Sequence, residues 1–278
     1  MSAPAGTVAA AAPPPPVRKV TRARVVGTVL LAAWGLFFLG LAALLVEGYD
    51  PEMVSRHLPR ILSGVWVTVQ LVVLAIGIGA AISLPVAAGR LSENPVLGAL
   101  AFGYSYFFRG TPLLAQTFVV YYGAGSFAAE LKSVGLWWFF RDAFNCAVFT
   151  FALNTAAYQA EILAGAIRSV PSGQWQAAAA LGLHRGVTLR KVILPQALIV
   201  ALRPYGNEIV LMIKGSSVAA IITVFDLMGQ TRYAFSKTYD MQVYLWAALL
   251  YLAMVEVLRR IWNRLEIRLT RHLRRRTD

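Results

Sequence analysis

Six long apolar segments divide the chain, and their length limits the folds open to it more than any other feature. They cover residues 25–46, 61–88, 96–122, 143–167, 196–222 and 241–261. A helix needs about 20 apolar residues to cross a bilayer, and hydrocarbon offers no partner for open backbone groups. Hydrophobic residues make up 58% of the 278 positions and charged residues only 14%, which excludes a soluble domain. We therefore predict an all-α polytopic membrane protein.

The basic residues predict how these segments are oriented. The chain carries 26 Lys and Arg residues against 13 Asp and Glu residues, a formal net charge of +13. Most basic residues gather at one set of segment ends, which is the cytoplasmic bias of membrane proteins, so no nucleic-acid partner is expected. The orientation that fits places both termini and residues 169–195 in the cytoplasm. The basic tail, residues 263–278, is expected to rest on anionic membrane lipid.

A polar stretch between the fourth and fifth segments, residues 169–195, contains a short predicted helix. Pro171 and Ser172 offer a stop and an N-cap oxygen, and residues 174–181 are mostly good helix formers. Gly182 can adopt the left-handed conformation that closes a helix at its C-terminus. The sequence therefore marks both ends of this helix.

A helix of two or three turns is marginal in water, so the predicted segment needs a surface to pack on. Its apolar face includes Trp175 and Leu181, and we expect this face to dock into a groove of another protein. An ordinary amphipathic loop helix without a partner is the alternative.

The spacing of this stretch resembles the EAA loop of ATP-binding-cassette (ABC) importer permeases. That pattern is Glu-Ala-Ala, three residues, Gly, nine residues and Ile-x-Leu-Pro, and the chain has Gln176-Ala177-Ala178, Gly182 and Val192-Ile193-Leu194-Pro195 at the same intervals. Gln176 and Val192 replace the usual Glu and Ile, which removes one possible charged contact to the ATPase. The resemblance implies that the ATPase is contacted by Gln174, Trp175, Gln176, Ala177, Ala178, Leu181, Gly182, Leu194 and Pro195.

Further stretches are similar to polar amino-acid permeases of the histidine/lysine/arginine/ornithine type. They read FRGTPLLAQ from Phe108, NTAAYQAEILAGAIRSVPSGQ from Asn154, VILPQAL from Val192 and ALRPYGNEIVLMIKGSS from Ala201. The stretches NEIVLM and TVFDLMG are most similar to the M subunit, including relatives that carry opines. The resemblance implies a type I ABC importer transmembrane domain with five core spans over residues 58–262.

Two segments precede this core. Residues 25–46 are an additional N-terminal span by comparison with the five-span relatives. Residues 1–24 are rich in Ala and Pro and are expected to form a disordered basic tail. Neither segment is required for the core prediction.

The resemblance also implies a transport function and a set of partners. The chain is expected to be the permease subunit of an importer that moves polar, basic amino acids or opines across the inner membrane. Expected partners are ABC ATPase subunits, a periplasmic or other extracytoplasmic amino-acid-binding protein, and a related Q-type permease subunit, with a homodimer as the alternative. No GxxxxGK[ST] motif is present, so we expect no catalytic activity and no cofactor in this chain, with ATP and Mg²⁺ on the ATPase.

Polar residues form a stripe on the fourth apolar segment. Thr150, Asn154, Tyr158, Glu161 and Gly165 recur at spacings of three and four residues, so they share one face of a helix. On the opposite face alanine recurs at every fourth position from residue 152, which allows another helix to approach closely. We interpret the stripe as the lining of a polar pathway, and hydrogen bonding between helices is the alternative.

Ionisable residues at membrane depth need partners or water, because a buried charge is costly there. We hypothesise that Glu161 and Glu208 attract a cationic or zwitterionic amino acid. Arg109 is expected to pair with one of them or with the substrate carboxylate, and salt bridges that only position helices are the alternative. The predicted pathway residues are Arg109, Thr150, Asn154, Tyr158, Glu161, Asn207 and Glu208.

Two prolines are expected to disturb the helices that carry these charges. Gly110-Thr111-Pro112 should interrupt the third segment directly after Arg109, and Pro204 should kink the fifth. Irregular backbone at this depth is tolerated only where protein or a wet cavity covers it.

The cysteine and histidine residues argue against a disulfide and against a metal site. Cys146 is the single cysteine, so no intramolecular disulfide is possible, and His57, His184 and His272 lie in three different loops or tails without metal-ligand spacing. Two other classes stay open: an ATP-independent secondary transporter or channel subunit, and a noncatalytic membrane scaffold. The coupling segment disfavours the first, and the polar residues at depth disfavour the second.

Overall fold

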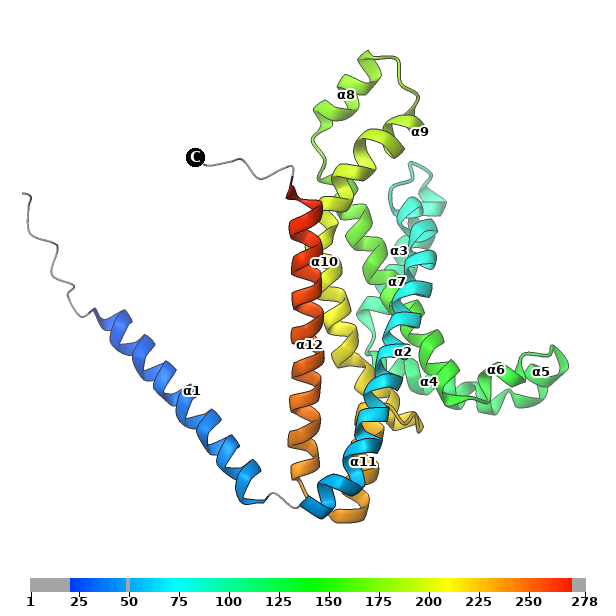
Figure 1. Ribbon diagram of the computed structural model, residues 1–278. Coiled ribbons are helices and arrows are strands. Elements are labelled where there is room, and N and C mark those ends of the chain that lie inside the picture. Colours follow the sequence, from blue (N-terminus) through cyan, green and yellow to red (C-terminus); the bar gives the residue numbers. More distant parts are fainter. Residues whose placement is uncertain (1–20, 49–50, 272–278) are drawn as a thin grey trace, which may run out of the picture. The chain divides into compact units, whose positions relative to one another are not determined.

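Every regular element in the part of the chain that the structure describes is helical, as predicted. The computed structural model describes residues 21–48 and 51–271 (Figure 1). The elements are α1 (Arg22–Glu47), α2 (Pro51–Arg90), α3 (Pro95–Gly110), α4 (Leu113–Ser126), α5 (Ala128–Ser133), α6 (Trp137–Phe140), α7 (Ala143–Arg168), α8 (Ser172–Ala180), α9 (Arg185–Thr188), the π-turn η1 (Leu189–Ile193), α10 (Leu194–Gly215), the 3₁₀ turn η2 (Ser216–Ile222), α11 (Leu227–Thr238) and α12 (Gln242–Leu269).

Helix α1 belongs to a unit of its own, residues 1–49, separate from residues 50–278. It has no buried residue, and its exposed side chains are apolar around most of the helix, as expected of a helix surrounded by lipid. The predicted disordered tail lies outside the described residues up to position 20. Its last residues, from Arg22 onward, are already helical.

Three described helices are long and apolar enough to cross a membrane by length and composition. They cover Arg22–Glu47, Val54–Arg90 and Gln242–Leu269, and the pair Arg185–Ile222 and Leu227–Thr238, bent by 49°, makes a fourth if it is one span. The predicted span at 96–122 is broken into α3 and α4. The predicted span at 143–167 is α7, which other helices cover, so it does not need side chains suited to lipid.

The core is built around α7, which packs along α2 and also contacts α10, α4 and α3. The predicted small-residue face of α7 is fully buried, with Ala152, Ala156 and Ala160 at most 1% exposed. Gly79 of α2 lies against this face, since a Cβ built there would be 2.5 Å from Cγ2 of Thr155. Close helix contact therefore organises the bundle as the alanine spacing predicted.

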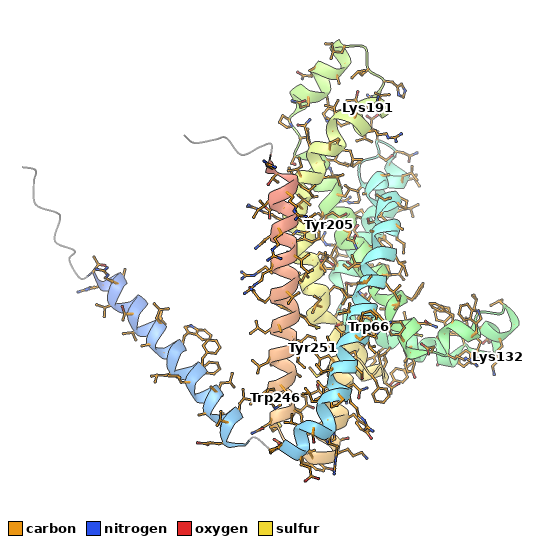
Figure 2. All side chains as sticks on the ribbon, in the orientation of Figure 1. Trp66, Lys132, Lys191, Tyr205, Trp246 and Tyr251 are labelled. Atoms are coloured by element: carbon orange, nitrogen blue, oxygen red, sulfur yellow. The ribbon has the colours of Figure 1, made fainter. Side chains whose placement is uncertain are left out.

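The two ends of the bundle carry different elements. Helices α8 and α9 lie at one end, where α7 ends and α10 begins, whereas α11 lies at the other end (Figure 1). Lys191 lies near α9 at the first of these ends, whereas Lys132 lies on α5, which projects sideways from the bundle with α6 (Figure 2). Helix α8, which carries most of the residues predicted to meet the ATPase, thus lies at one end of the bundle.

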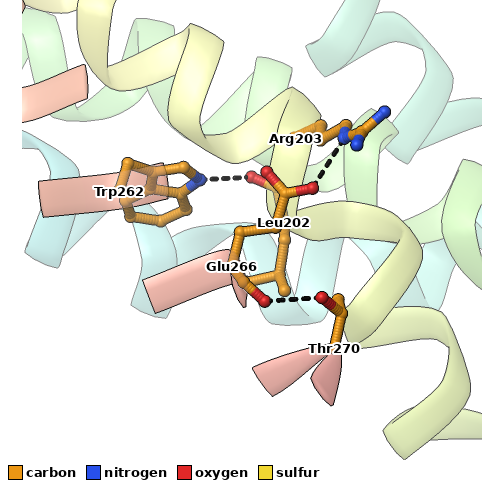
Figure 3. Close-up of polar contacts among 5 residues, drawn as sticks. All are labelled: Leu202, Arg203, Trp262, Glu266 and Thr270. Carbon is orange, nitrogen blue, oxygen red and sulfur yellow. Dashed lines mark hydrogen bonds and ion pairs between the residues drawn. The ribbon is translucent and has the colours of Figure 1, made fainter. Parts of the chain in front are cut away.

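Helix α12 is packed on α10 through a polar seam (Figure 3). The Trp262 indole N–H donates to the Leu202 carbonyl at 2.8 Å, and Nε of Arg203 lies 2.7 Å from Oε1 of Glu266. Helix α12 continues to Leu269, so the first part of the predicted tail at 263–278 prolongs this helix. Residues 272–278 lie outside the described part of the chain.

Gly206 makes this seam possible, and a side chain there is expected to open it. A Cβ at position 206 would lie 2.4 Å from Nε1 of Trp262, a distance that side chains do not tolerate. We expect Gly206→Ala to lower the free energy of unfolding by about 1–3 kcal/mol through overpacking. The measurement is the thermal unfolding midpoint of the purified complex. Adding Trp262→Leu should restore part of the loss, and a fully stable Gly206→Ala variant would contradict the packing.

Candidate substrate pathway and coupling segment

The break between α3 and α4 is the first element of the candidate pathway. The predicted interruption is present: α3 ends at Gly110, and Pro112 precedes the first residue of α4. Nε2 of Gln116 donates to the Phe108 carbonyl at 2.9 Å and to Oγ1 of Thr111 at 2.7 Å. Nδ2 of Asn154 donates to the same Phe108 carbonyl at 2.8 Å. Two amide side chains therefore satisfy the backbone that the break leaves open.

Thr150 and Asn154 lie in these packed contacts and not in a cavity. Nδ2 of Asn154 also donates to Oε1 of Gln116 at 3.0 Å, and Oγ1 of Thr150 donates to the Cys146 carbonyl of its own helix at 2.8 Å. Both side chains are buried. For these two residues the structure favours the alternative of hydrogen bonding over the predicted pathway lining.

Removing the Asn154 amide is expected to destabilise the helix break. In Asn154→Leu the Gln116 amide oxygen loses a buried donor, and an unsatisfied buried polar group costs about 1–3 kcal/mol. The thermal midpoint of the assembled complex should fall accordingly. Thr150→Val is the matched control, because the Thr150 hydroxyl bonds only within its own helix turn. If Asn154→Leu were as stable as the wild type, Asn154 would not stabilise the break between α3 and α4.

A cavity of about 370 Å³ lies between α3, α7 and α10, and three predicted pathway residues line it: Arg109, Tyr158 and Glu161. The Arg109 guanidinium carbon lies 5.3 Å from the centre of the Tyr158 ring, a cation–π contact. Within residues 21–48 and 51–271, Arg109 forms no salt bridge within 4.0 Å. The predicted pairing of Arg109 with Glu161 or Glu208 is therefore absent in this conformation, and its pairing with a substrate carboxylate stays a prediction.

Glu161 has a different partner, which the sequence analysis missed. Its Oε1 lies 2.5 Å from Nε of Arg90, the last residue of α2, and both side chains are only 20% exposed. Arg168 in turn donates a hydrogen bond to the Arg90 carbonyl. The need of Glu161 for a partner was a usable signal, but Arg90 is 71 positions away along the chain.

Glu208 lies apart from this cavity. It is 6% exposed and its Oε1 accepts a hydrogen bond from Oγ1 of Thr155 at 2.7 Å. Thr155 also accepts from Nε2 of Gln159 at 3.2 Å. Asn207 lines a second cavity of about 440 Å³ beside the seam of α10 and α12. The seven predicted pathway residues are thus divided between one cavity, a second cavity and the packed core.

The coupling segment forms the predicted helix, α8. Gly182 has φ +71°, and the N–H groups of Gly182 and Leu183 donate to the carbonyls of Ala179 and Ala178, which closes the helix as predicted. The predicted N-cap is wrong. Ser172 is already helical, Pro171 occupies the cap position in an extended conformation, and no side chain caps the first turn.

Trp175 and Ala178 fix α8 to its own chain. Ala178 is 3% exposed, and Trp175 is half-buried against a cluster that includes Val170, Ile193 and Ala197. Trp175 is therefore partly covered by its own chain, but it also lines an open cavity with Leu183 and Leu189, so its contact with a partner stays a prediction. Leu181 is 78% exposed and remains available, as do the exposed Gln174, Gln176, Ala177 and Gly182.

The end of the coupling segment forms a short π-helix, η1, which leads directly into α10. This π-helix was not predicted from the sequence. Leu194 is the first residue of α10 and half-buried, and Pro195 follows as an exposed second residue. Proline is tolerated in a first helical turn because its missing N–H has no partner there. The Leu-Pro of the motif thus starts the helix that carries Glu208.

A further polar site at the opposite end of the bundle was also missed. Asp226 is fully buried before α11, where its Oδ1 accepts from the Gly229 N–H at 2.8 Å and caps the helix. Its other oxygen accepts from the Tyr251 hydroxyl at 3.4 Å, and Oγ1 of Thr68 accepts from the Leu227 N–H at 3.0 Å. This network ties α11 to α2 and α12. The motif TVFDLMG contained the signal, since Asp precedes an apolar helical start.

Known proteins are similar to this chain in sequence. The chain is 40% identical over 228 residues to the nopaline transport system permease protein of Agrobacterium fabrum, covering 82% of this chain and 95% of the relative. It is 39% identical over 213 residues to the histidine/lysine/arginine/ornithine transport system permease protein of Escherichia coli, with coverages of 76% and 90%. The arginine ABC transporter permease protein of the same species is 36% identical over 197 residues, with coverages of 71% and 88%.

Solved structures agree in fold. A crystal structure of an amino acid ABC transporter with histidines superposes with a TM-score of 0.70 at 32% identity, over 79% of this chain and 99% of that one. An inward-facing methionine ABC transporter gives a TM-score of 0.65 at 20% identity, over 80% and 100% of the chains, which shows the fold alone. Residues 75–271 match the family described as binding-protein-dependent transport system inner membrane component. The chain belongs to this family and is a permease subunit of an ABC importer for amino acids.

Proposed function

We propose that this permease moves basic amino acids or opines across the inner membrane. The observation that carries the proposal is the cavity at Arg109, Tyr158 and Glu161, which places one cation and one carboxylate on a common lining. An amino acid with a cationic side chain presents the complementary pair of charges. The cargoes named for two of the relatives include arginine, lysine and ornithine, whose side chains are cationic, and the cargo named for a third is nopaline.

The coupling segment supports a drive by a separate ATPase. Leu181 and the exposed polar face of α8 meet a nucleotide-binding subunit in this proposal, and ATP with Mg²⁺ binds there and not to this chain. Trp175 and Ala178 fix α8 to its own chain, so a force on α8 is passed to α7 and α10. A helix held in this way acts as a lever.

The orientation and the partner subunits follow from the same assignment. The end with α8 and α9 faces the cytoplasm, together with both termini, and the other end receives the amino acid from an extracytoplasmic binding protein. The second permease subunit is a related Q-type chain, as the similarity to M-type relatives supports. Residues 263–269, which prolong α12, add basic charge at the cytoplasmic lipid headgroups.

Reconstituted uptake tests the function. The complex is placed in liposomes, and entry of labelled L-arginine is measured with and without ATP, the ATPase partner and the binding protein. We expect uptake only when all three are present. Uptake that persists without ATP would support the alternative of a secondary transporter or channel.

Arg109 tests the site within that assay. Arg109→Gln removes the unpaired cation from the cavity, and we expect L-arginine uptake to fall at least about tenfold, the equivalent of a lost charge-assisted contact. Assembly and basal ATP hydrolysis should persist, because Arg109 forms no salt bridge in the described chain. Arg109→Lys should retain part of the uptake, whereas normal uptake in Arg109→Gln would place the pathway elsewhere.

A further inference from the structure

Among the described residues that line the cavity at Arg109 and Tyr158, one is acidic, and its carboxylate is already paired. Glu161 is that residue, and its carboxylate is held by the Arg90 guanidinium at 2.5 Å. A carboxylate bound in this way is not free to receive the cationic side chain of a substrate. We propose that Arg90 is an internal counter-ion that competes with the cationic group of the substrate for Glu161. This inference rests on the proposed function.

The position of Arg90 allows its guanidinium to leave Glu161 and still keep a second favourable contact. It is the last residue of α2, and its guanidinium carbon lies 5.2 Å from the centre of the Phe102 ring on α3. An aromatic face attracts a guanidinium by about 0.5–2 kcal/mol, depending on exposure. Because the Phe102 ring contacts Arg90 independently of Glu161, release from Glu161 does not require Arg90 to enter an apolar environment alone.

A buried hydroxyl lies beside the same carboxylate. Ser105 of α3 is 3% exposed, and its hydroxyl faces the Glu161 carboxylate at a geometry too poor for a regular hydrogen bond. Buried hydroxyl groups are nearly always hydrogen-bonded, and the Glu161 carboxylate is the acceptor that this hydroxyl faces.

The exchange is linked to the coupling segment through one residue. Arg168, which donates to the Arg90 carbonyl, is the last residue of α7 and stands shortly before α8 begins at Ser172. Displacement of α8 therefore moves the group that holds the end of α2. In this arrangement the ATPase-driven movement changes the competition between Arg90 and substrate, and Arg90 is a positioning residue of the transport cycle.

Direct binding to the assembled transporter tests the proposal. The full complex in lipid nanodiscs, without binding protein, is titrated with labelled L-arginine and with its neutral isostere L-citrulline. In Arg90→Gln the competitor is absent, and we expect the Kd for L-arginine to fall about tenfold while that for L-citrulline is unchanged. Arg90→Lys, which lacks the planar fork, should lower it by a smaller factor of about three. Arg56→Gln, which breaks an exposed pair on the same helix, is the control and should change neither.

The outcomes separate the inference from the proposed function. Glu161→Gln should weaken L-arginine binding and make a second Arg90→Gln change silent. If Glu161→Gln weakens binding but neither Arg90 variant tightens it, Arg90 is structural and the inference is overturned. If the wild-type complex does not bind L-arginine at all, the proposed substrate class is wrong. If the Arg90→Gln complex does not assemble, Arg90→Lys decides the question. An unchanged or raised Kd for L-arginine in Arg90→Lys would show that Arg90 does not compete with the substrate for Glu161.

Discussion

Leu181→Asp is expected to abolish ATP-driven uptake and leave the permease folded. Leu181 ends α8 with 78% of its surface exposed, at the protruding end of the bundle, so its own chain does not need it for packing. If it fills an apolar groove of the ATPase, a charge there loses a central contact, which typically costs about 2–4 kcal/mol. That loss lowers ATPase capture by about 30-fold or more. The measurement is L-arginine uptake together with copurification of the ATPase subunit.

The control must introduce the same charge at an equally exposed apolar position. Val134, which follows α5 away from the coupling end, is 66% exposed and serves this purpose. Val134→Asp should copurify the ATPase at wild-type levels. If Leu181→Asp does so as well, and uptake persists, the ATPase does not contact this end of α8 and the coupling assignment fails.

The features that spacing encodes could be predicted from the sequence. Gly182 closes α8, Pro112 separates α3 from α4, and the alanine face of α7 is buried, because each is set by residues within one or two turns. Local rules fix such elements. The type I importer fold followed from the family motifs, since the apolar pattern alone does not specify how spans pack.

Pairings between distant residues could not be predicted. The partner of Glu161 is on α2 and that of Glu208 is on α7, and periodicity along one helix carries no information about which neighbour it meets. The stripe on α7 was correctly placed on one face, but that face is long. Its upper part, with Tyr158 and Glu161, borders a cavity, whereas its lower part, with Thr150 and Asn154, packs against the helix break.

The half-buried position of Trp175 shows a second limit of prediction from the sequence. A short helix with an apolar face predicts a docking surface, but it does not say whether the surface belongs to a partner or to the same chain. The cluster around Ile193 supplies that surface from η1 and the end of α7. The half-buried Trp175 therefore stabilises α8 before any partner binds, which leaves Leu181 to make the contact outside.

Gly79→Val is expected to prevent assembly of the permease. A Cβ at position 79 would lie 2.5 Å from Cγ2 of Thr155 and 3.1 Å from the Ala152 carbonyl oxygen. Relief requires α2 and α7 to separate, and since α7 is the centre of the bundle, the change affects most of the core. Overpacking of this kind costs about 1–3 kcal/mol or more. It also pushes Thr155 away from Glu208, which would leave a buried carboxylate without its donor.

Gly77 provides the matched control on the same helix. A Cβ there has no atom within 4 Å, so Gly77→Val adds the same side chain to α2 without a clash. We expect Gly77→Val to be recovered as a monodisperse complex with a wild-type thermal midpoint, and Gly79→Val to be lost to aggregation or degradation. Since both variants change helix propensity equally, any difference between them reports the contact of α2 with α7. Equal recovery of the two would mean that α2 and α7 do not pack at Gly79.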